Sequence, residues 1–161
     1  MRVVITGGAG FVGQFLARQL LARGVLIDAQ DQRRDISEIF LFDHQAPAFW
    51  QADVSQHCQF VQGNMQDGQA LADLVTGDDA LSVFHLASIV SGEGEEDFTL
   101  AMNVNLHGNL YLLEALRARE TLAKIVFASS IATFGGDMPD MVGDITKQTP
   151  QTTYGMTKAI G

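Results

Sequence analysis

Glycines near the N-terminus have the spacing of a turn that binds a phosphate. The stretch TGGAGFVG contains Gly7, Gly10 and Gly13 at intervals of three, and Gly8 forms an overlapping Gly-x-Gly-x-x-Gly with the last two. Glycines allow a tight turn and let backbone N–H groups approach a pyrophosphate, which the following helix N-terminus also attracts. Because the motif follows an apolar run and opens an amphipathic helix, it predicts a dinucleotide-binding turn.

Such a turn needs a carboxylate after the second strand to hold the adenosine ribose. Asp28 and Asp31 have about the expected distance along the chain, roughly 20 residues from the glycines. Asp43 directly follows the best apolar strand of the region, and we choose it, treating 25–38 as an insertion. His44 and Gln45 come next in place of an arginine that could accept a 2′-phosphate, which favours NAD over NADP.

A tyrosine and a lysine near the end of the chain form a second candidate site. Tyr154 and Lys158, in TYGMTK, are four positions apart and share one face of a helix. Tyr-x-x-x-Lys also occurs by chance, so the other motifs decide whether the pair is chemistry or packing.

The elements that position these residues alternate between strands and helices. The expected strands are 2–6, 39–42, 58–61, 81–87 and 124–130, and the expected helices are 11–23, about 69–76, roughly 98–119 and one starting near Tyr154. This alternation predicts an α/β fold with a doubly wound parallel sheet, the Rossmann fold. Residues 25–38 and 44–57 are expected to be loops within one domain, and the acidic run 93–97 a solvated loop.

Composition excludes several classes of protein. A net charge of −9 argues against nucleic acid or an anionic membrane surface as the main partner. The lone Cys58 excludes an internal disulfide framework and suits the cytoplasm. No stretch approaches the roughly 18–20 apolar residues that span a bilayer. His44, His57 and His107 lack metal-ligand spacing, so no metal is expected, and His85 is expected in the core.

The ordered stretches TGGAGFVG, QGNMQD, FHLAS, NVNLHGN, FASSIATFG and YGMTK resemble the extended short-chain dehydrogenase/reductase superfamily of NAD-dependent epimerases and dehydratases. This resemblance covers the whole chain. Within the superfamily, HLASIVSGEGEEDFTLAMNVN and the insertion before LFDHQAP are similar to the NAD-dependent D-erythronate dehydrogenases.

The resemblance assigns most of the chain's candidate residues to NAD binding. It implies that the pyrophosphate turn is formed by Gly7, Gly10, Phe11, Val12 and Gly13. Asn64 and Met65 would lie beside the adenine, although the family usually has an aspartate in place of Asn64. The residues expected along the rest of the cofactor are Leu86, Ala87, Ser88 and Asn105.

The resemblance also answers what Tyr154 and Lys158 do. It implies that Tyr154 is the acid/base, and a nearby ammonium and the oxidised nicotinamide both favour its ionised form. Lys158 would also hold the nicotinamide ribose. Ser130 would donate a hydrogen bond to the substrate oxygen, with Ser129 as its rival.

The implied activity is oxidation of a secondary hydroxyl of a sugar acid by hydride transfer to NAD. The alternatives are an NDP-sugar epimerase or dehydratase, and a non-catalytic NAD-binding regulatory module. Members of the superfamily continue into a C-terminal part that binds substrate and often forms a homodimer. Residues 1–161 are therefore expected to be an N-terminal fragment, one NAD-binding Rossmann domain without its substrate part.

Overall fold

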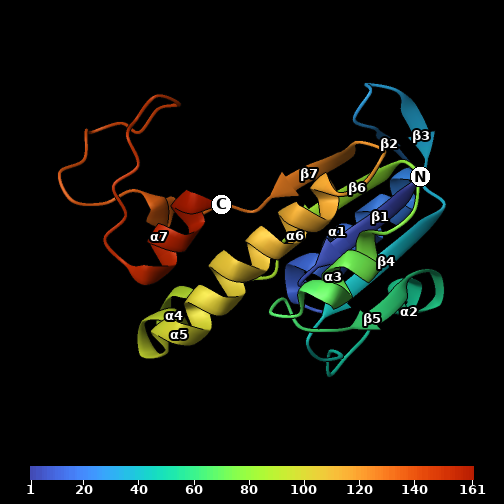
Figure 1. Ribbon diagram of the computed structural model, residues 1–161, viewed down its shortest axis with the longest axis horizontal. Helices are drawn as coiled ribbons and strands as arrows, with labels where there is room; N and C mark the ends of the chain where they lie inside the picture. The colour runs from blue at the N-terminus through green and yellow to red at the C-terminus, as the bar shows by residue number, and fades with distance from the viewer. The chain divides into compact units, whose positions relative to one another are not determined.

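The computed structural model describes residues 1–161, and five parallel strands form its main sheet (Figure 1). The strands are β1 (Arg2–Thr6), β4 (Glu38–Asp43), β5 (Gln59–Gln62), β6 (Leu81–His85) and β7 (Ala123–Phe127), in the order β5-β4-β1-β6-β7. Every neighbouring pair in this order is parallel. The predicted doubly wound parallel sheet is confirmed.

The central strand β1 is buried on both faces, as its unbroken apolar sequence predicts. Val3, Val4 and Ile5 have no exposed surface. On one face, Val3 and Ile5 belong to a cluster with residues of β4 and of two helices, α1 (Phe11–Arg23) and α2 (Ala52–His57). Burying a side chain of this size contributes about 1.5–3 kcal/mol. The sheet is therefore anchored at β1, the strand that leads into the glycine turn.

Two predicted helices have clear start or stop signals. Helix α1 ends at Gly24, which adopts the left-handed conformation with φ 67° that favours glycine. Helix α3 (Gly68–Val75) begins after Asp67, whose carboxylate accepts hydrogen bonds from the backbone N–H groups of Gln69 and Ala70.

The predicted long helix over 98–119 is a helical run with an irregular centre. It consists of α5 (Phe98–Ala101), a π-helical segment η1 (Met102–His107) and α6 (Gly108–Arg117). A π segment inserts an extra residue per turn and often marks a functional position. Helical periodicity alone does not distinguish it from an α-helix.

Three segments expected to be loops contain regular structure. Residues 25–38 include an antiparallel pair, β2 (Val25–Ile27) and β3 (Arg33–Asp35). Residues 44–57 include α2, and the acidic run lies mostly in α4 (Ser91–Glu96). The sequence hides both helices because each buries a single residue, Val54 in α2 and Gly94 in α4, so neither has an apolar stripe.

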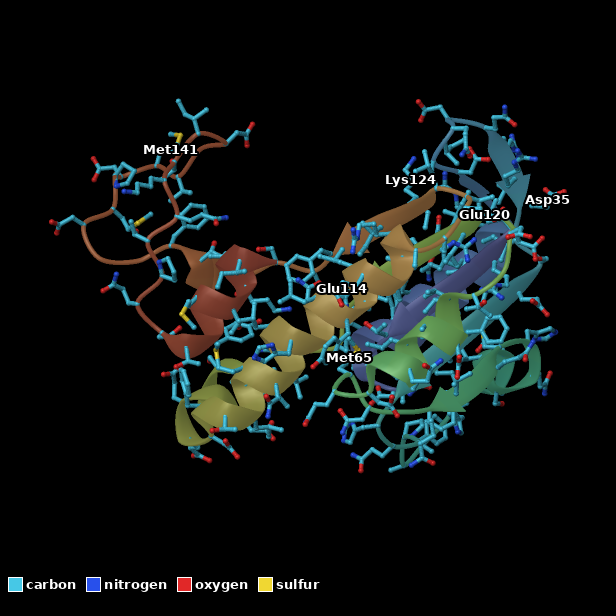
Figure 2. The ribbon with its side chains drawn as sticks, viewed as in Figure 1. Asp35, Met65, Glu114, Glu120, Lys124 and Met141 are labelled. Atoms are coloured by element: carbon cyan, nitrogen blue, oxygen red, sulfur yellow. The ribbon has the colours of Figure 1, made fainter.

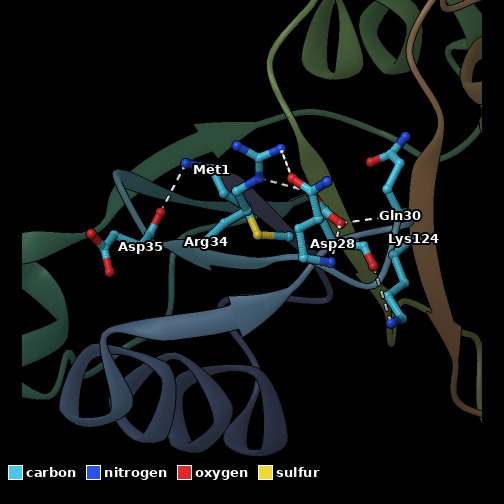
Figure 3. Close-up of polar contacts among 7 residues, drawn as sticks. Met1, Asp28, Gln30, Arg34, Asp35 and Lys124 are labelled. Atoms are coloured by element: carbon cyan, nitrogen blue, oxygen red, sulfur yellow. Dashed lines mark hydrogen bonds and ion pairs between the residues drawn. The ribbon is translucent and has the colours of Figure 1, made fainter.

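The β2–β3 pair is organised by one buried carboxylate (Figure 3). Asp28 is 1% exposed and accepts hydrogen bonds from the backbone N–H groups of Gln30 and Gln32. Its other oxygen accepts from Arg34 Nε at 2.8 Å. The hydrogen bond from Arg34, followed by that from Gln32, lowers the pKa of Asp28. Lys124 Nζ also donates to the Asp28 carbonyl oxygen at 3.3 Å, which ties the pair to β7.

The chain folds as two compact units. Unit 1 consists of Met1–Ala87 and Tyr111–Ala128, and unit 2 of Ser88–Leu110 and Ser129–Gly161. Unit 2 contains α4, α5, η1, a 3-10 helix η2 (Ile131–Thr133) and α7 (Thr153–Ile160). Met141, labelled in Figure 2, lies in its long loop between η2 and α7. The expected single domain over 1–161 stays a prediction. No helix is long and apolar enough to cross a membrane.

The role of Asp28 predicts a pH-dependent stability. Asp28→Asn keeps the size of the side chain and removes its charge, so we expect thermal unfolding several degrees lower at pH 7. A lowered folded pKa means that the carboxylate stabilises the fold above its ordinary pKa of 3.8. That stabilisation is lost as the pH falls through the folded pKa, and the two proteins should converge there.

The matched control is Asp31→Asn. Asp31 has φ 58°, a conformation that asparagine also tolerates, so this variant should unfold like the wild type. Equal stability of Asp28→Asn and wild type at pH 7 would contradict the structural role of the Asp28 carboxylate.

Candidate functional site

The glycine turn between β1 and α1 has no room for side chains at its tightest point. A Cβ atom on Gly13 would lie 2.4 Å from Gly7 O and 2.7 Å from Gly8 Cα. A Cβ on Gly8 would lie 2.7 Å from Leu41 Cα on β4, and Gly7 has φ 68°. Three of the glycines are therefore required for the turn itself to fold.

Gly10 differs from its neighbours because it has space beside it. The one atom within 4 Å of a Cβ built there is Gly7 O, at 3.3 Å. Gly10 is the N-cap of α1, and the next two side chains, Phe11 and Val12, are 85% and 59% exposed. The first N–H groups of a helix lack partners within it and attract anions. This end of α1 is thus open to a pyrophosphate at the bare Gly10 backbone.

Asp43 lies against this turn at the end of β4. Parallel pairing aligns Phe42 with Thr6, so the next residue on β4 adjoins the glycines. Asp43 Oδ2 accepts a hydrogen bond from Ala9 N at 3.1 Å, and Oδ1 accepts from His44 N at 2.8 Å. A carboxylate oxygen has two acceptor positions, so Oδ2 keeps one for a ribose hydroxyl.

The rival carboxylates lie elsewhere. Asp28 is committed to the β2–β3 pair, and Asp31 lies in the turn between those strands. The geometry favours Asp43, whose role at the ribose stays a prediction.

The remaining cofactor residues of unit 1 lie at the ends of β5 and β6. Asn64 Oδ1 accepts a hydrogen bond from Gln66 N at 3.0 Å, and Met65 is 5% exposed (Figure 2). Ala87 N donates to Thr6 Oγ1 at 3.2 Å and approaches Gly7, while Leu86 N donates to Thr6 O. These residues follow parallel strands on the same edge of the sheet as the glycine turn, where α/β folds bind ligands.

His85 and Cys58 are structural in character. His85 is 1% exposed, as expected for a core residue, and its Nδ1 lies 2.6 Å from Thr6 Oγ1. Burial, with a smaller effect from Asp53, raises the pKa of the Cys58 thiol to about 11. No group of three or more His, Cys, Asp or Glu side chains could hold a metal ion.

Gln14 is a site residue that sequence reasoning missed. It is 7% exposed, and its Nε2 donates to Ala9 O at 3.0 Å and to Phe49 O at 3.3 Å. Its Oε1 accepts from Gln51 N at 3.1 Å. The side chain thus ties the loop after Asp43 to the glycine turn. The available signal was a polar residue directly after Gly13, on the side of α1 that faces the protein.

In unit 2, α7 brings Tyr154 and Lys158 together. Lys158 Nζ lies 5.9 Å from the centre of the Tyr154 ring. Lys158 is 5% exposed, and burial lowers the pKa of its ammonium to about 8. The predicted pair therefore shares one helical face, with the cationic member buried. Lysines are rarely buried to this degree unless they are paired, and shifted pKa values cluster at functional sites, which makes the pair a candidate site.

Gly155 holds α7 against the segment that contains Ser130. A Cβ on Gly155 would lie 2.1 Å from Ala132 O, so the helix approaches η2 as closely as a backbone can. Ser130 caps η2, and its Oγ accepts a hydrogen bond from Ala132 N at 3.1 Å, which leaves its O–H free to donate. Ser129 Oγ instead points to Lys158 O at 3.4 Å. The predicted strand over 124–130 ends earlier, at Phe127.

Asn105 and Ser88 form one polar cluster in unit 2. Asn105 lies in η1 and is 5% exposed. Its Oδ1 accepts from Ile89 N at 2.7 Å and from Ser88 Oγ at 3.1 Å. Its Nδ2 donates to Ile89 O at 2.9 Å and to Thr157 Oγ1 at 3.2 Å. Their expected place beside the cofactor stays a prediction.

The fold and these residues define a class of protein. A glycine turn between a central parallel strand and its helix, with a carboxylate at the next strand end, is the pattern of dinucleotide-binding α/β enzymes. A tyrosine beside a buried lysine adds a group that can exchange protons with a substrate. The bare Gly10 backbone and the spare acceptor position of Asp43 fit NAD.

Comparison with known proteins agrees with this class. Residues 3–161 match the NAD dependent epimerase/dehydratase family. The chain is 42% identical to D-erythronate dehydrogenase from Cupriavidus necator, over 100% of this chain and 48% of that protein.

Two solved structures are similar as well. The nucleoside-diphosphate-sugar epimerase from Agrobacterium tumefaciens has a TM-score of 0.79 at 32% identity, covering 99% of this chain and 46% of that one. UDP-glucose 4-epimerase from Thermus thermophilus in complex with NAD has a TM-score of 0.77 at 29% identity, covering 99% and 48%.

The chain belongs to the NAD dependent epimerase/dehydratase family. The resemblance drawn from its motifs is confirmed, including the narrower one to D-erythronate dehydrogenases, and so is NAD as the cofactor of the family. The chain spans about half the length of the curated relatives it matches.

Gly10, which has space beside it, and Gly13, which has none, should respond differently to replacement by alanine. Gly10→Ala places a methyl group where we expect the pyrophosphate, so NAD affinity should fall by about tenfold or more, the equivalent of about 1.4 kcal/mol. Its unfolding in urea should stay near that of the wild type, because a small shift relieves the 3.3 Å contact with Gly7 O.

Gly13→Ala is the matched control. It overpacks the turn and should destabilise the protein by on the order of 1–3 kcal/mol. Calorimetry measures the NAD affinity of each variant, and urea unfolding measures its free energy of unfolding. Normal NAD affinity in a folded Gly10→Ala protein would show that the pyrophosphate does not bind at this turn.

Proposed function

We propose that this chain is the NAD-binding and acid/base part of a dehydrogenase that oxidises a secondary hydroxyl of a sugar acid such as D-erythronate. The observation that carries the proposal is the Tyr154–Lys158 pair on α7, with Nζ 5.9 Å from the ring centre. A protein that only sensed NAD would have no use for an acid/base. The 42% identity to D-erythronate dehydrogenase supports the substrate class.

Unit 1 supplies the residues that hold the cofactor. The turn with Gly7, Gly10 and Gly13 would hold the pyrophosphate, together with the first N–H groups of α1 at Phe11 and Val12. Asp43 accepts from the adenosine ribose, which the geometry at Oδ2 allows. Asn64 and Met65 would lie beside the adenine, and Leu86 and Ala87, directly after β6, would line the rest of the cofactor.

Unit 2 supplies the chemistry of the substrate oxygen. Tyr154, as phenolate, takes the hydroxyl proton while the C–H bond breaks, and the alcohol becomes a ketone. NAD, when bound, would supply the acceptor for the hydride of that bond. Lys158, whose Nζ lies 5.9 Å from the centre of the Tyr154 ring, would stabilise the phenolate with its ammonium and would donate to the nicotinamide ribose. Ser130 donates its free O–H to the substrate oxygen and steadies the developing charge.

Sugar-nucleotide epimerisation is the second candidate function. It is favoured by the TM-score of 0.79 to a nucleoside-diphosphate-sugar epimerase. Such an enzyme returns the hydride to the sugar, so NADH does not accumulate, whereas a dehydrogenase releases NADH.

The proposal for the whole protein also includes a homodimer, as the resemblance to the superfamily implies.

A chimera tests the activity directly. The 161-residue chain is joined to the part of the Cupriavidus necator relative beyond the matched residues, and NADH absorbance is followed with aldonic acids and sugar nucleotides. We expect NADH to accumulate with D-erythronate or a close analogue. Tyr154→Phe should then lower kcat by about 10²–10⁴ and leave NAD affinity nearly unchanged, because only the proton-transferring hydroxyl is lost.

The control is Tyr111→Phe, the same change at the chain's other tyrosine, which lies 38% exposed on α6. It should retain wild-type turnover. A Tyr154→Phe chimera that keeps most of its activity would show that another group is the base.

A further inference from the structure

A buried glutamine joins the glycine turn to the loop that follows Asp43. Gln14 is 7% exposed, and its Nε2 donates to Ala9 O at 3.0 Å and to Phe49 O at 3.3 Å. Its Oε1 accepts from Gln51 N at 3.1 Å. Ala9, whose carbonyl oxygen Gln14 holds, also donates its N–H to Asp43 Oδ2 at 3.1 Å. One side chain of α1 therefore contacts both the turn and the 44–51 loop, all within unit 1.

The two ends of the 44–51 loop are fixed by contacts that do not involve Gln14. At its start, His44 N donates to Asp43 Oδ1 at 2.8 Å, and Gln62 Nε2 donates to His44 O at 3.0 Å. Near its end, the Trp50 ring packs edge-on against Phe60, with 5.5 Å between the ring centres. These contacts join the ends of the loop to strands β4 and β5.

The middle of the loop depends on Gln14. Residues 45–49 make one hydrogen bond, in which Phe49 O accepts from Gln14 Nε2. The Phe49 ring is 78% exposed, so its packing does little to hold the loop. A second contact between α1 and α2, the ion pair of Arg18 with Asp53 at 2.9 Å, is exposed. Exposed ion pairs contribute little to stability.

Loss of the Gln14 side chain amide would leave three backbone groups without their partner. These are the carbonyl oxygens of Ala9 and Phe49 and the N–H of Gln51. Buried backbone groups without a partner are unfavourable, so a freed loop would move until water reaches them. The ends of the loop would keep their own contacts. Gln14 therefore controls the position of the middle of the loop.

We propose that Gln14 is a positioning residue for cofactor selection. It keeps the 44–51 loop in one position beside the ribose site at Asp43, where the loop occupies the space that a 2′-phosphate would need. This inference rests on the proposed function, because it takes Asp43 as the residue that holds the ribose. Residues 44–51 contain no arginine or lysine, so the loop offers no fixed cation to that phosphate. A loop that is fixed before binding also loses little conformational entropy when NAD binds.

The test compares the binding of NAD and NADP to the 161-residue chain by calorimetry. Gln14→Leu keeps a helix-forming side chain of similar size and removes all three hydrogen bonds. NAD should bind about three- to tenfold more weakly, because its binding must then order the loop. NADP should bind as well as before or better, because the freed loop makes room for the 2′-phosphate. The control is Gln19→Leu, the same change on the exposed face of α1, which should keep both wild-type affinities.

Gln51→Pro breaks the same contact from the side of the loop. Gln51 has φ −67°, which proline also adopts, and the substitution removes the N–H that donates to Gln14 Oε1. The ratio of NAD affinity to NADP affinity should shrink as it does in Gln14→Leu. Hydrogen exchange gives a readout without cofactor: the backbone N–H groups of 44–51 should exchange faster in both variants, and those of β1 and β4 at wild-type rates.

A wild-type affinity ratio in either folded variant overturns the inference, because Gln14 would then only stabilise the fold. Faster exchange throughout β1 and β4 in both variants also overturns it, since the side chain would then support unit 1 and not the loop. The measurements use no substrate, so a chimera that is inactive on sugar acids would overturn the proposed function and leave this result standing. A wild-type chain that binds neither nucleotide would overturn the inference together with the NAD site.

Discussion

The close approach of Gly13 to Gly7 and Gly8 is the constraint on which the candidate site depends. With 2.4 Å between Gly7 O and the position of a Gly13 Cβ, only glycine lets α1 start directly after β1. The same turn brings Ala9 N to the carboxylate of Asp43. Since β1 pairs with β4 on one side and β6 on the other, the turn lies where the winding of the sheet reverses. Sheets of this kind bind their ligands at that point.

The candidate residues of unit 2 differ from the glycine turn because one of them, Lys158, is an ionisable group whose burial costs free energy. Burial lowers the pKa of Lys158 to about 8, so at neutral pH the folded chain holds an ammonium in a poorly hydrated position. Buried ionisable groups with shifted pKa values cluster at functional sites, where proteins tolerate their destabilising effect. Within unit 2, α7 is contacted by Asn105, which donates to Thr157 Oγ1, and packs its Gly155 closely against Ala132.

Much of the fold follows from local sequence signals. An unbroken apolar run identifies β1, the largely apolar LSVFH identifies β6, and the stripe ending at Gly24 identifies α1. The apolar strand that ends on Asp43 separates this carboxylate from Asp28 and Asp31. The β2–β3 pair was not predictable in this way, because β3 is the fully exposed RRD and Asp28 is buried only through its bonds with Arg34 and nearby backbone.

The missed parts of the site share one physical cause. Gln14, Glu95 and Thr157 act through hydrogen bonds to residues far along the chain, and no periodicity encodes such a partner. The π segment is equally hidden, because its apolar pattern continues that of the flanking helices. Gly155 could have been found, since a glycine directly after Tyr154 interrupts a helix unless another backbone needs the space.

The central claim is that the glycine turn and Asp43 together select NAD, and calorimetry on the 161-residue chain tests it most directly. NAD and NADP are titrated into the wild type and Asp43→Ala. A carboxylate beside the ribose repels a 2′-phosphate, so NAD should bind more tightly to the wild type, and the ratio of the two affinities should shrink in Asp43→Ala. Equal affinities of the wild type for both nucleotides, or an unchanged ratio in the variant, would contradict the account.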